Sequence, residues 1–365
     1  MSYSTEQIRN VALAGHPGAG KTTLFEALLH AGGALQTAGS IERGNTVSDH
    51  DGIEKERGHS IDAAIASTDH AGIHVNLIDT PGYPDFRGPM LSALAAVETV
   101  AVVVDADTGI GYGTRRAMDY AEGRRLCRVL VVNKIDHEGQ DLAALLESLR
   151  ETFGSVVLPL NLPADGGRAV IDCFGNSTGD SDLGPVADWH QRIIDQVVEI
   201  NEGVMDHFLD AGEEGLSGDE LHDAFEQCLR EGHLIPVCFV SARSGTGVKA
   251  LLDIAERLFP HPGEANPPLF VKGRGDGASP VQCVPDPAAH VVADVFRIVN
   301  DPFVGKLGVF RVYQGTVKKD TQLFVDDGRK PFKVGHLFNL RGREPLERDQ
   351  AIPGYIAAAA KVPEP

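Results

Sequence analysis

The sequence predicts an α/β protein: a doubly wound α/β domain that carries an inserted α/β subdomain and is followed by a small β-barrel domain. Apolar runs alternate with helical patterns in the first part of the chain, as expected for a parallel sheet covered by helices. Residues 151–240 carry 18 Asp and Glu against 3 Lys and Arg, a net charge of −15. Residues 266–365 carry 11 against 14, a net of +3, and follow a proline-rich linker at Pro260–Pro268. Three compartments of different charge therefore indicate three structural units.

The first domain is expected over residues 1–154 and 241–262. Its strands are predicted from continuous apolar runs, which are typical of strands buried on both faces of a sheet. The expected strands are Ile8–Ala14, Ile61–Ser67, His74–Asp79, Thr99–Asp105, Arg128–Asn133 and Ile235–Val240. The expected helices are Thr22–Leu29, Thr114–Glu122, Leu142–Phe153 and Val248–Phe259.

The acidic block at residues 155–240 is expected to be an insertion, because the strand-and-helix pattern resumes near its end. Its expected elements are strands at Val156–Leu160 and Ala169–Asp172, an irregular stretch at Gly175–Gly184, and acidic helices at Val186–Leu209 and Asp219–Glu231. Residues 266–365 alternate strand patterns with Gly and Asp turns, which favours a small barrel. Its expected strands are Ala293–Val299, Leu307–Gln314, Gln322–Val325 and Lys333–Phe338.

The composition excludes several classes of protein. The 365 residues are 42% hydrophobic and 23% charged, as in ordinary globular proteins, and no apolar run reaches the ~18 residues of a membrane span. Residues 1–10 have no signal-peptide pattern, and five scattered cysteines indicate reduced thiols in a cytoplasm. A net charge of −19 argues against general binding to DNA or other nucleic acid.

A phosphate-binding loop is predicted where the first strand ends. Residues Gly15–Thr22 read GHPGAGKT, which matches GxxxxGK[ST] between an expected strand and an expected helix. Glycines allow backbone N–H groups to curl around a phosphate, and the helix N-terminus adds partial positive charge. Lys21 supplies a cation to the β- and γ-phosphates, and the Thr22 hydroxyl is a ligand for Mg²⁺. The alternative is a Gly-rich turn that only caps a helix.

A base-binding motif is predicted at the end of a later strand, where α/β folds place ligand loops. Asn133–Asp136 reads NKID, and a carboxylate at Asp136 can accept both the N1–H and the 2-amino group of guanine. The backbone of Ser241 and Ala242, after the last strand, would then contact the guanine carbonyl. An NKxD sequence alone could also be a strand-end turn, and the dipeptide alone carries no evidence.

Two further segments fit the end of a nucleotide that carries a γ-phosphate. Asp79–Gly82 reads DTPG, so that Asp79 can hold Mg²⁺ through water and the Gly82 N–H can sense a γ-phosphate. Ala31–Ser60 is long, Gly-rich and without periodicity, which is unusual for a passive loop. We call it the switch segment, because such segments order around γ-phosphate and Mg²⁺. The alternatives are an ordinary turn and a mobile surface insertion.

These motifs together resemble those of a known family, the translational GTPases, and specifically elongation factor G. GHPGAGKTT, ERGHSI (56–61), DTPGYPDF (79–86), NKID and SAR (241–243) follow that family's order and spacing. The runs Asp301–Leu307 (DPFVGKL) and Phe310–Gly315 (FRVYQG) are similar to its second-domain barrel, and the acidic block resembles its insert. The resemblance implies a P-loop GTPase fold and places this chain on the front half of a longer factor.

The resemblance, together with the motifs, implies a set of site residues for GTP or GDP and Mg²⁺. The phosphates are expected at Gly15, His16, Gly18, Ala19, Gly20, Lys21, Thr22, Thr23, Asp79 and Gly82. The guanine is expected at Asn133, Lys134, Asp136, Ser241, Ala242 and Arg243. Mg²⁺ is expected on Thr22 and Ser60, and through water on Asp79. Catalytic roles are expected for Lys21, Gly82 and Tyr83.

Four positions depart from the family pattern. Tyr83 stands where the family has a histidine that positions the attacking water on the ribosome, and a phenol is not an acid–base group at neutral pH. Ser60 replaces a threonine and keeps the hydroxyl, Gly18 replaces an aspartate, and His59 replaces an isoleucine. These departures favour an atypical paralogue with weak hydrolysis. His59 is a candidate to replace the missing histidine, against the alternative of a solvent-facing loop residue.

The resemblance implies a GTP-hydrolysing translation factor, stimulated by the ribosome, that acts in translocation or a related step. The alternatives are a nucleotide-dependent ribosome-binding module with little turnover, and a recycling or protection GTPase. The acidic insert is expected to meet the basic ribosomal stalk protein, unless it is only a solvated surface. The GTPase and barrel domains are expected to contact ribosomal RNA. A cytoplasmic monomer that binds no membrane is expected.

Overall fold

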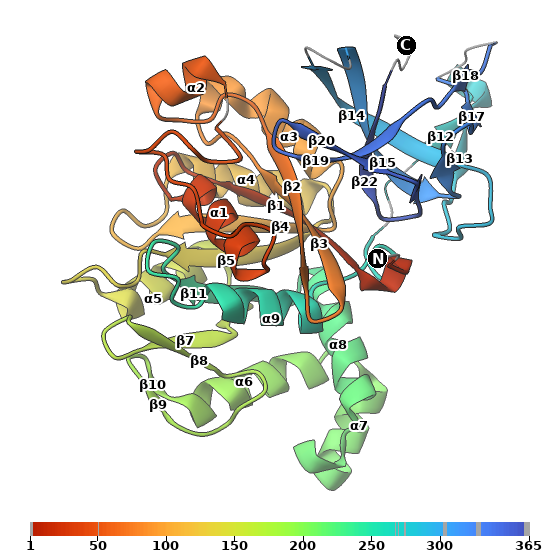
Figure 1. The fold of residues 1–365 in the computed structure, drawn as a ribbon. Coiled ribbons are helices and arrows are strands. Elements are labelled where there is room, and N and C mark those ends of the chain that lie inside the picture. The colour runs from red at the N-terminus through yellow and green to blue at the C-terminus, as the bar shows by residue number, and fades with distance from the viewer. Residues whose placement is uncertain are drawn as a thin grey trace.

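A computed structural model describes residues 3–49, 51–266, 268, 270–273, 275–301, 305–325 and 330–360. Its largest feature is a seven-stranded sheet with the strand order β2-β3-β1-β4-β5-β11-β6 (Figure 1). Neighbouring strands run parallel, except that β2 is antiparallel to β3. The strands are β1 Ile8–Gly15, β2 Ala64–His70, β3 Ile73–Asp79, β4 Thr99–Asp105, β5 Cys127–Asn133, β6 Val157–Pro159 and β11 Ile235–Val240. The predicted α/β class is confirmed.

Helices cover both faces of this sheet, and two hydrophobic clusters lie between the layers. Helices α1 (Lys21–Ala31) and α9 (Val248–Leu258) pack on one face. Helices α3 (Arg87–Leu94), α4 (Tyr112–Gly123) and α5 (Leu142–Phe153) pack on the other. Short 3₁₀ turns lie at Thr5–Gln7, Pro84–Phe86, Glu213–Gly215 and Gly275–Gly277. None of the helices among the described residues is both long and apolar enough to cross a bilayer.

The acidic block is joined to the main sheet by its first strand, because β6 pairs with β11 at the sheet edge. Two small hairpins follow, made of β7 (Asn161–Ala164) with β8 (Ala169–Asp172) and β9 (Asp180–Ser181) with β10 (Gly184–Pro185). Strand β7 escaped the sequence analysis, as did the short β9–β10 pair inside the expected irregular stretch. Helices α6 (Val186–Val198), α7 (Glu202–Ala211) and α8 (Gly218–Glu231) complete the block and extend away from the sheet (Figure 1).

The prediction of one helix over Val186–Leu209 is wrong, because the chain forms two helices there. The break follows Glu199, and α7 restarts after Asn201, whose side-chain Oδ1 accepts hydrogen bonds from the Gly203 and Val204 N–H groups. Asparagine is a strong helix N-cap, since it satisfies amides that have no partner in the first turn. The apolar periodicity continues across the break and concealed it.

The C-terminal part, which we call the β-domain, is built on a five-stranded antiparallel sheet with the order β14-β15-β22-β19-β20. Its strands are β14 Val292–Asp301, β15 Gly305–Gln314, β19 Leu337–Arg341, β20 Glu344–Arg348 and β22 Ile356–Ala360. Three two-stranded pairs surround it: β12 Phe270–Lys272 with β13 Ser279–Val281, β16 Val317–Lys318 with β21 Gln350–Ala351, and β17 Gln322–Leu323 with β18 Phe332–Lys333. Pro302–Val304 of the DPFVGKL run lie outside the described residues.

The expected strand Lys333–Phe338 is also wrong, because it is divided between β18 and β19. Strand β18 ends at Lys333, and Val334 exchanges backbone hydrogen bonds with Asp320 and Thr321, just before β17. The chain then crosses to the five-stranded sheet at Leu337. The alternation of apolar and polar residues continues from β18 into β19, so the sequence pattern alone did not show that the strand is divided.

The switch segment is mostly irregular, but it contains one short helix, α2 (Gly52–Arg57). Asp51 caps this helix, and the Glu54 carboxylate accepts hydrogen bonds from the Ile61 and Asp62 N–H groups at 2.9 and 3.2 Å. These amides are therefore unavailable for a β ladder. For this reason β2 begins at Ala64, three residues later than expected.

Candidate functional site

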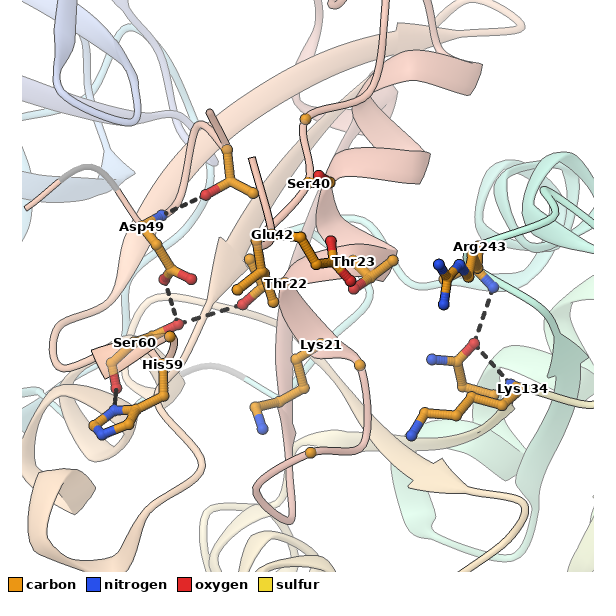
Figure 2. Close-up of a pocket in the computed structure, with 18 of the residues that line it drawn as sticks. Lys21, Thr22, Thr23, Ser40, Glu42, Asp49, His59, Ser60, Lys134 and Arg243 are labelled. Carbon is orange, nitrogen blue, oxygen red and sulfur yellow. Dashed lines mark hydrogen bonds between the residues drawn. The ribbon is translucent and has the colours of Figure 1, made fainter. Parts of the chain in front are cut away.

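A cleft of about 640 Å³ opens at the carboxyl ends of β1, β3, β5 and β11. In a parallel α/β sheet this edge is where ligands bind. The loop after each of these four strands contributes to the wall, and so does the switch segment, whose Ser40, Glu42, Asp49, His59 and Ser60 are labelled in Figure 2. The four sequence motifs and the switch segment, far apart in the chain, therefore surround one cavity.

The loop after β1 requires glycine at two positions because other backbone and side chains approach it closely. A Cβ on Gly15 would lie 2.4 Å from the Val103 carbonyl oxygen of β4, and one on Gly20 would lie 2.4 Å from Asn133 Nδ2. Gly20 also has a φ of +87°, which favours glycine. Helix α1 begins directly after it at Lys21, so that the free amides of its first turn face the cleft.

Lys21 is the buried cation of this loop. Its Nζ donates hydrogen bonds to the Gly15 and His16 carbonyl oxygens at 3.3 and 3.0 Å, and only 7% of the residue is exposed. Burial lowers the pKa of the ammonium to about 8, although the nearby carboxylates Asp79 and Asp49 oppose this shift. The loop therefore holds a positive charge that is poorly solvated and gains from an anionic ligand.

Hydroxyl and carboxylate groups meet beside Lys21. The Thr22 hydroxyl donates to Asp79 Oδ2 at 2.7 Å and lies 3.3 Å from the Ser60 hydroxyl. Ser60 donates to Asp49 Oδ1 at 2.6 Å, and Ser48 donates to Asp79 Oδ2 at 2.7 Å (Figure 2 shows the Ser60 contacts). Thr22, Ser60 and Asp79 thus lie in one hydrogen-bonded cluster, together with Ser48 and Asp49 of the switch segment.

Asp79 is completely buried at the end of β3. Burial raises the pKa of its carboxyl group to about 6, and hydrogen bonds from Ser48 and Thr22 moderate the shift. Among the described residues, its Oδ1 atom has no hydrogen-bond partner. A buried carboxylate oxygen without a partner, next to hydroxyl oxygens, is the kind of donor set that Mg²⁺ prefers.

Asn133 links three of the four loops. Its side-chain amide donates to the Ala19 carbonyl oxygen at 2.9 Å, and its Oδ1 accepts from the Lys134 and Ala242 N–H groups, each at 2.9 Å. The motif asparagine therefore fixes the phosphate loop, its own loop and the loop after β11 relative to one another.

The remaining base-site residues lie around the same end of the cleft. Lys134, Asp136, Ser241, Ala242 and Arg243 all line it. Lys134 has a φ of +68°, and its Nζ forms an ion pair with Asp105 Oδ2 at 2.6 Å. Ser241 is buried and ties its loop together through the Thr246 carbonyl oxygen at 2.8 Å. Arg243 is exposed at the rim.

Four of the expected phosphate-site residues do not line the cleft. Gly15, His16, Ala19 and Asp79 lie behind the residues that form its wall, which include Gly18, Gly20, Lys21, Thr22, Thr23 and Gly82. His16 turns its ring toward α4, where Nδ1 accepts a hydrogen bond from the Gly113 N–H at 3.3 Å. Its ring therefore braces the loop against α4.

The loop after β3 brings two aromatic groups to the opening. A Cβ on Gly82 would lie 2.5 Å from Lys21 Nζ and 2.9 Å from the Pro17 backbone nitrogen, so that any larger residue would force the phosphate loop to shift. Tyr83 is 42% exposed, and its ring centroid lies 4.5 Å from that of His59. Both residues line the cleft. His59 is therefore a half-buried neighbour of Tyr83 at the opening of the cleft.

Sequence reasoning missed three acidic or hydroxyl residues that organise the switch segment. Ser48 and Asp49 belong to the cluster around Asp79. Glu26 of α1 is buried and accepts hydrogen bonds from the Val47 and Gly39 N–H groups at 2.5 and 2.9 Å. No spacing distinguishes these residues in the sequence, because their roles depend on where an irregular segment crosses α1.

Comparisons with known proteins identify the family of this chain. The family model described as the elongation factor Tu GTP binding domain matches residues 6–261. An elongation factor G-like protein of Mycobacterium tuberculosis is 32% identical over 345 residues, which cover 91% of this chain and 48% of that protein. Elongation factor G 2 of Streptomyces coelicolor is 32% identical over 371 residues, which cover 96% of this chain and 53% of that protein.

A solved structure shows the same likeness. A crystal structure of a protein from Thermus thermophilus superposes with a TM-score of 0.81 and 34% identity, covering 98% of this chain and 52% of that chain. The chain thus spans about half the length of the curated relatives it matches. The chain therefore belongs to the translational GTPase family that shares the elongation factor Tu GTP-binding domain, as an elongation factor G-like member.

Proposed function

We propose that this GTPase binds GTP and GDP in the cleft, hydrolyses GTP with stimulation by the ribosome, and acts in translocation or a related ribosomal step. The observation that carries the proposal is the convergence of four motif loops and the switch segment on one cavity. Asn133 joins the phosphate loop to both base-site loops through hydrogen bonds of 2.9 Å. A single ligand with a phosphate end and a guanine end fits that arrangement.

Mg²⁺ fits the cluster beside Lys21. The Thr22 and Ser60 hydroxyls would hold it directly and Asp79 through water, because the donors are hard oxygens and Asp79 Oδ1 has no hydrogen-bond partner among the described residues. When bound, Mg²⁺ would neutralise the negative charge that develops on the phosphates. Asp49 holds the Ser60 hydroxyl in place, and Ser48 holds the Asp79 carboxylate.

Other residues of the cleft would contact the phosphates, the guanine and the attacking water. Lys21 gives the β- and γ-phosphates a buried positive charge, and the Gly82 backbone lies against Lys21 at the same phosphates. Asp136 accepts from the guanine edge, while the Ser241 and Ala242 backbone meets its carbonyl. Tyr83 and His59 lie together at the mouth of the cleft, where the attacking water would enter. We infer that His59 orients this water in part.

The partners follow from the charge of the surface. Helix α7 exposes Glu202, Asp206 and Asp210, together with Leu209, which is 72% exposed. An acidic surface with an apolar side chain suits a basic protein, and we propose the ribosomal stalk protein. Ribosomal RNA would contact the GTPase domain and the more basic β-domain. We propose that the protein acts as a cytoplasmic monomer.

Tyr83 favours a second candidate function, a ribosome-binding module with little turnover. We expect wild-type protein to release phosphate slowly alone and faster with ribosomes, and Tyr83→His to raise the stimulated rate at least tenfold, because imidazole transfers protons at neutral pH. Phosphate release by the complete gene product, with and without ribosomes, measures this.

Ile53→Ala serves as the control, since Ile53 is exposed on the switch segment and does not line the cleft. The binding module is supported if wild type and Tyr83→His both bind ribosomes only with GTP, and ribosomes accelerate phosphate release by neither protein. Absence of guanine-nucleotide binding contradicts both functions. A recycling or protection role is distinguished by the ribosomal state that the protein selects.

The guanine site also depends on a hairpin of the insert. The β7–β8 turn packs against the NKID loop, and a Cβ on Gly167 would lie 1.9 Å from the Ile135 carbonyl oxygen. We expect Gly167→Ala to displace Ile135 and Asp136 and to weaken GTP and GDP binding equally, about tenfold, through the loss of one charge-assisted hydrogen bond. Fluorescence titration with both nucleotides measures the effect.

Gly166→Ala is the matched control. Gly166 lies in the same turn with a φ of +61°, but nothing is within 4 Å of its Cβ position. It carries the same backbone strain without the collision. Equal losses for Gly166→Ala and Gly167→Ala would show that the turn itself, and not its contact with Ile135, is responsible.

A further inference from the structure

The β-domain touches the switch segment directly, backbone against backbone. Gly342, in the turn between β19 and β20, donates its N–H to the Ile65 carbonyl oxygen of β2 at 2.8 Å. A Cβ on Gly342 would lie 2.2 Å from the Val47 carbonyl oxygen and 2.9 Å from Val47 Cγ1. This hairpin lies beside β2 in Figure 1. Neither partner in this contact is the end of a flexible side chain, so an added methyl group must move the chain.

A second contact lies just past the other end of the switch segment. Arg297 of β14 forms an ion pair with Asp62 Oδ2 at 2.7 Å and also donates to the Ala63 carbonyl oxygen. The Arg297 side chain is 15% exposed and that of Asp62 is 53% exposed, so that the arginine is largely buried at the contact while the carboxylate partly faces solvent. The β-domain thus contacts the chain before Ser48 and after Ser60, on both sides of the residues that reach Asp79.

The contact at Val47 acts on a residue that is already held from the opposite side. The Val47 N–H donates to Glu26 Oε1 of α1 at 2.5 Å, while its carbonyl oxygen faces Gly342. The next residue, Ser48, donates to Asp79, and the one after it, Asp49, accepts from Ser60. A displacement of Val47 therefore passes within two residues to the whole hydroxyl and carboxylate cluster.

We propose that Gly342 and Arg297 are positioning residues of the triphosphate site, so that the β-domain forms its outer support. Through Val47 and Asp62 they hold Ser48, Asp49 and Ser60 at Asp79. This inference rests on the proposed function for its ligand. Because the switch segment serves the γ-phosphate and Mg²⁺, while the phosphate loop and the guanine loops hold the rest, the β-domain favours GTP over GDP.

The test compares binding of Mg²⁺ with a slowly hydrolysed GTP analogue, and of Mg²⁺ with GDP, to wild type and to Gly342→Ala. We expect the GTP analogue to bind at least tenfold more weakly and GDP to change by less than twofold. Amide hydrogen exchange over residues 46–60, measured without nucleotide, is expected to become at least tenfold faster. That second readout depends on neither hydrolysis nor nucleotide.

Matched variants distinguish a role in positioning the switch segment from a general loss of folding stability. Gly275→Ala adds a methyl group in the same domain at a φ of +59°, close to the +57° of Gly342, but with nothing within 4 Å, and is expected to change neither readout. Gly167→Ala is expected to weaken both nucleotides alike. Arg297→Met removes the ion pair but keeps the aliphatic stem, and is expected to weaken the GTP analogue three- to tenfold even if Gly342→Ala does not fold.

The binding and exchange measurements can each overturn the positioning role of Gly342 and Arg297. Equal weakening of both nucleotides by Gly342→Ala and Arg297→Met, or no change in binding and exchange, overturns the inference. If wild type binds no GTP, the proposed function fails. In that case unchanged exchange still overturns the positioning role of the β-domain, and faster exchange still supports it.

Discussion

Lys21→Met is expected to weaken GTP binding roughly a hundredfold while it raises the thermal stability of the nucleotide-free protein. Removal of a buried, hydrogen-bonded charge partner from a complex costs about 3 kcal/mol, which corresponds to this loss of affinity. In the free protein Lys21 is only 7% exposed, and burial lowers the pKa of its ammonium group to about 8. Methionine of similar length removes that desolvation cost.

The same residue predicts how binding depends on pH. Lys21 of the free protein loses its proton above pH 8, whereas the complex with anionic phosphates requires the ammonium form. With a pKa of about 8, GTP affinity should therefore fall about tenfold between pH 7 and pH 9, and binding at pH 9 should take up close to one proton. Calorimetry in buffers with different ionisation heats measures the proton directly.

Folding stability depends on pH in the opposite direction to GTP affinity: it rises with pH. The folded-state pKa lies below the value of an unfolded lysine, so the unfolded chain binds more protons between about pH 8 and pH 10.5. Lys21 thus destabilises the fold at neutral pH, and this cost is relieved as the pH rises through that window. Lys21→Met should lose this dependence together with the dependence of GTP affinity.

Lys249→Met is the control, because Lys249 is 74% exposed on α9 and forms only a surface ion pair with Asp253. Neither GTP affinity nor its pH dependence should change in that variant. A Lys21→Met protein that is less stable than wild type without nucleotide would contradict the desolvation argument. Affinity that is constant from pH 7 to pH 9 would contradict the lowered pKa.

Those parts of the fold in which burial is regular could be predicted from sequence. Thr99–Asp105 and Leu142–Phe153 have their predicted bounds, because the first is buried along its whole length and the second has an amphipathic helical period. Prediction failed where a local hydrogen bond overrides the pattern. Asn201 restarts a helix inside a continuous apolar period, and Glu54 takes the amides that would have begun β2 earlier.

The alanine-rich strand β22 also escaped prediction. Its sequence IAAAA has little β propensity, yet all five residues are buried between β15 and β19. Tertiary packing decides such a strand. The candidate site divides in the same way: motif residues such as Lys21 and Asn133 have spacings that carry chemistry, whereas Ser48, Glu26 and Gly342 act only through the path of the folded chain.

Arg311→Met is expected to destabilise the protein by about 3–5 kcal/mol at pH 7.5, since it leaves a buried carboxylate without its cation. Arg311 of β15 and Glu98, just before β4, form an ion pair in which the side chains are 3% and 4% exposed. Arg311 also donates to the Ala96 carbonyl oxygen at 2.9 Å, and Asn10 donates to Glu98 at 2.8 Å. The pair joins the β-domain to the GTPase domain.

A double variant separates the pair from the packing around it. Glu98→Leu combined with Arg311→Met removes both charges, so its stability should return to within about 1 kcal/mol of wild type or exceed it. Urea unfolding, followed by circular dichroism and by the fluorescence of Trp189, measures each protein. A double variant as unstable as Arg311→Met would show that the shape of the guanidinium matters more than its charge.

The size of the loss in the single variant tests whether the interface is closed. Arg311→Met leaves Glu98, whose side chain is 4% exposed, without its cation, so a full loss requires that water stays excluded from the carboxylate. A loss well below about 3 kcal/mol would mean that water reaches Glu98, and that the two domains separate readily in solution. A full loss requires the closed interface, which is also the arrangement that places Gly342 on Val47.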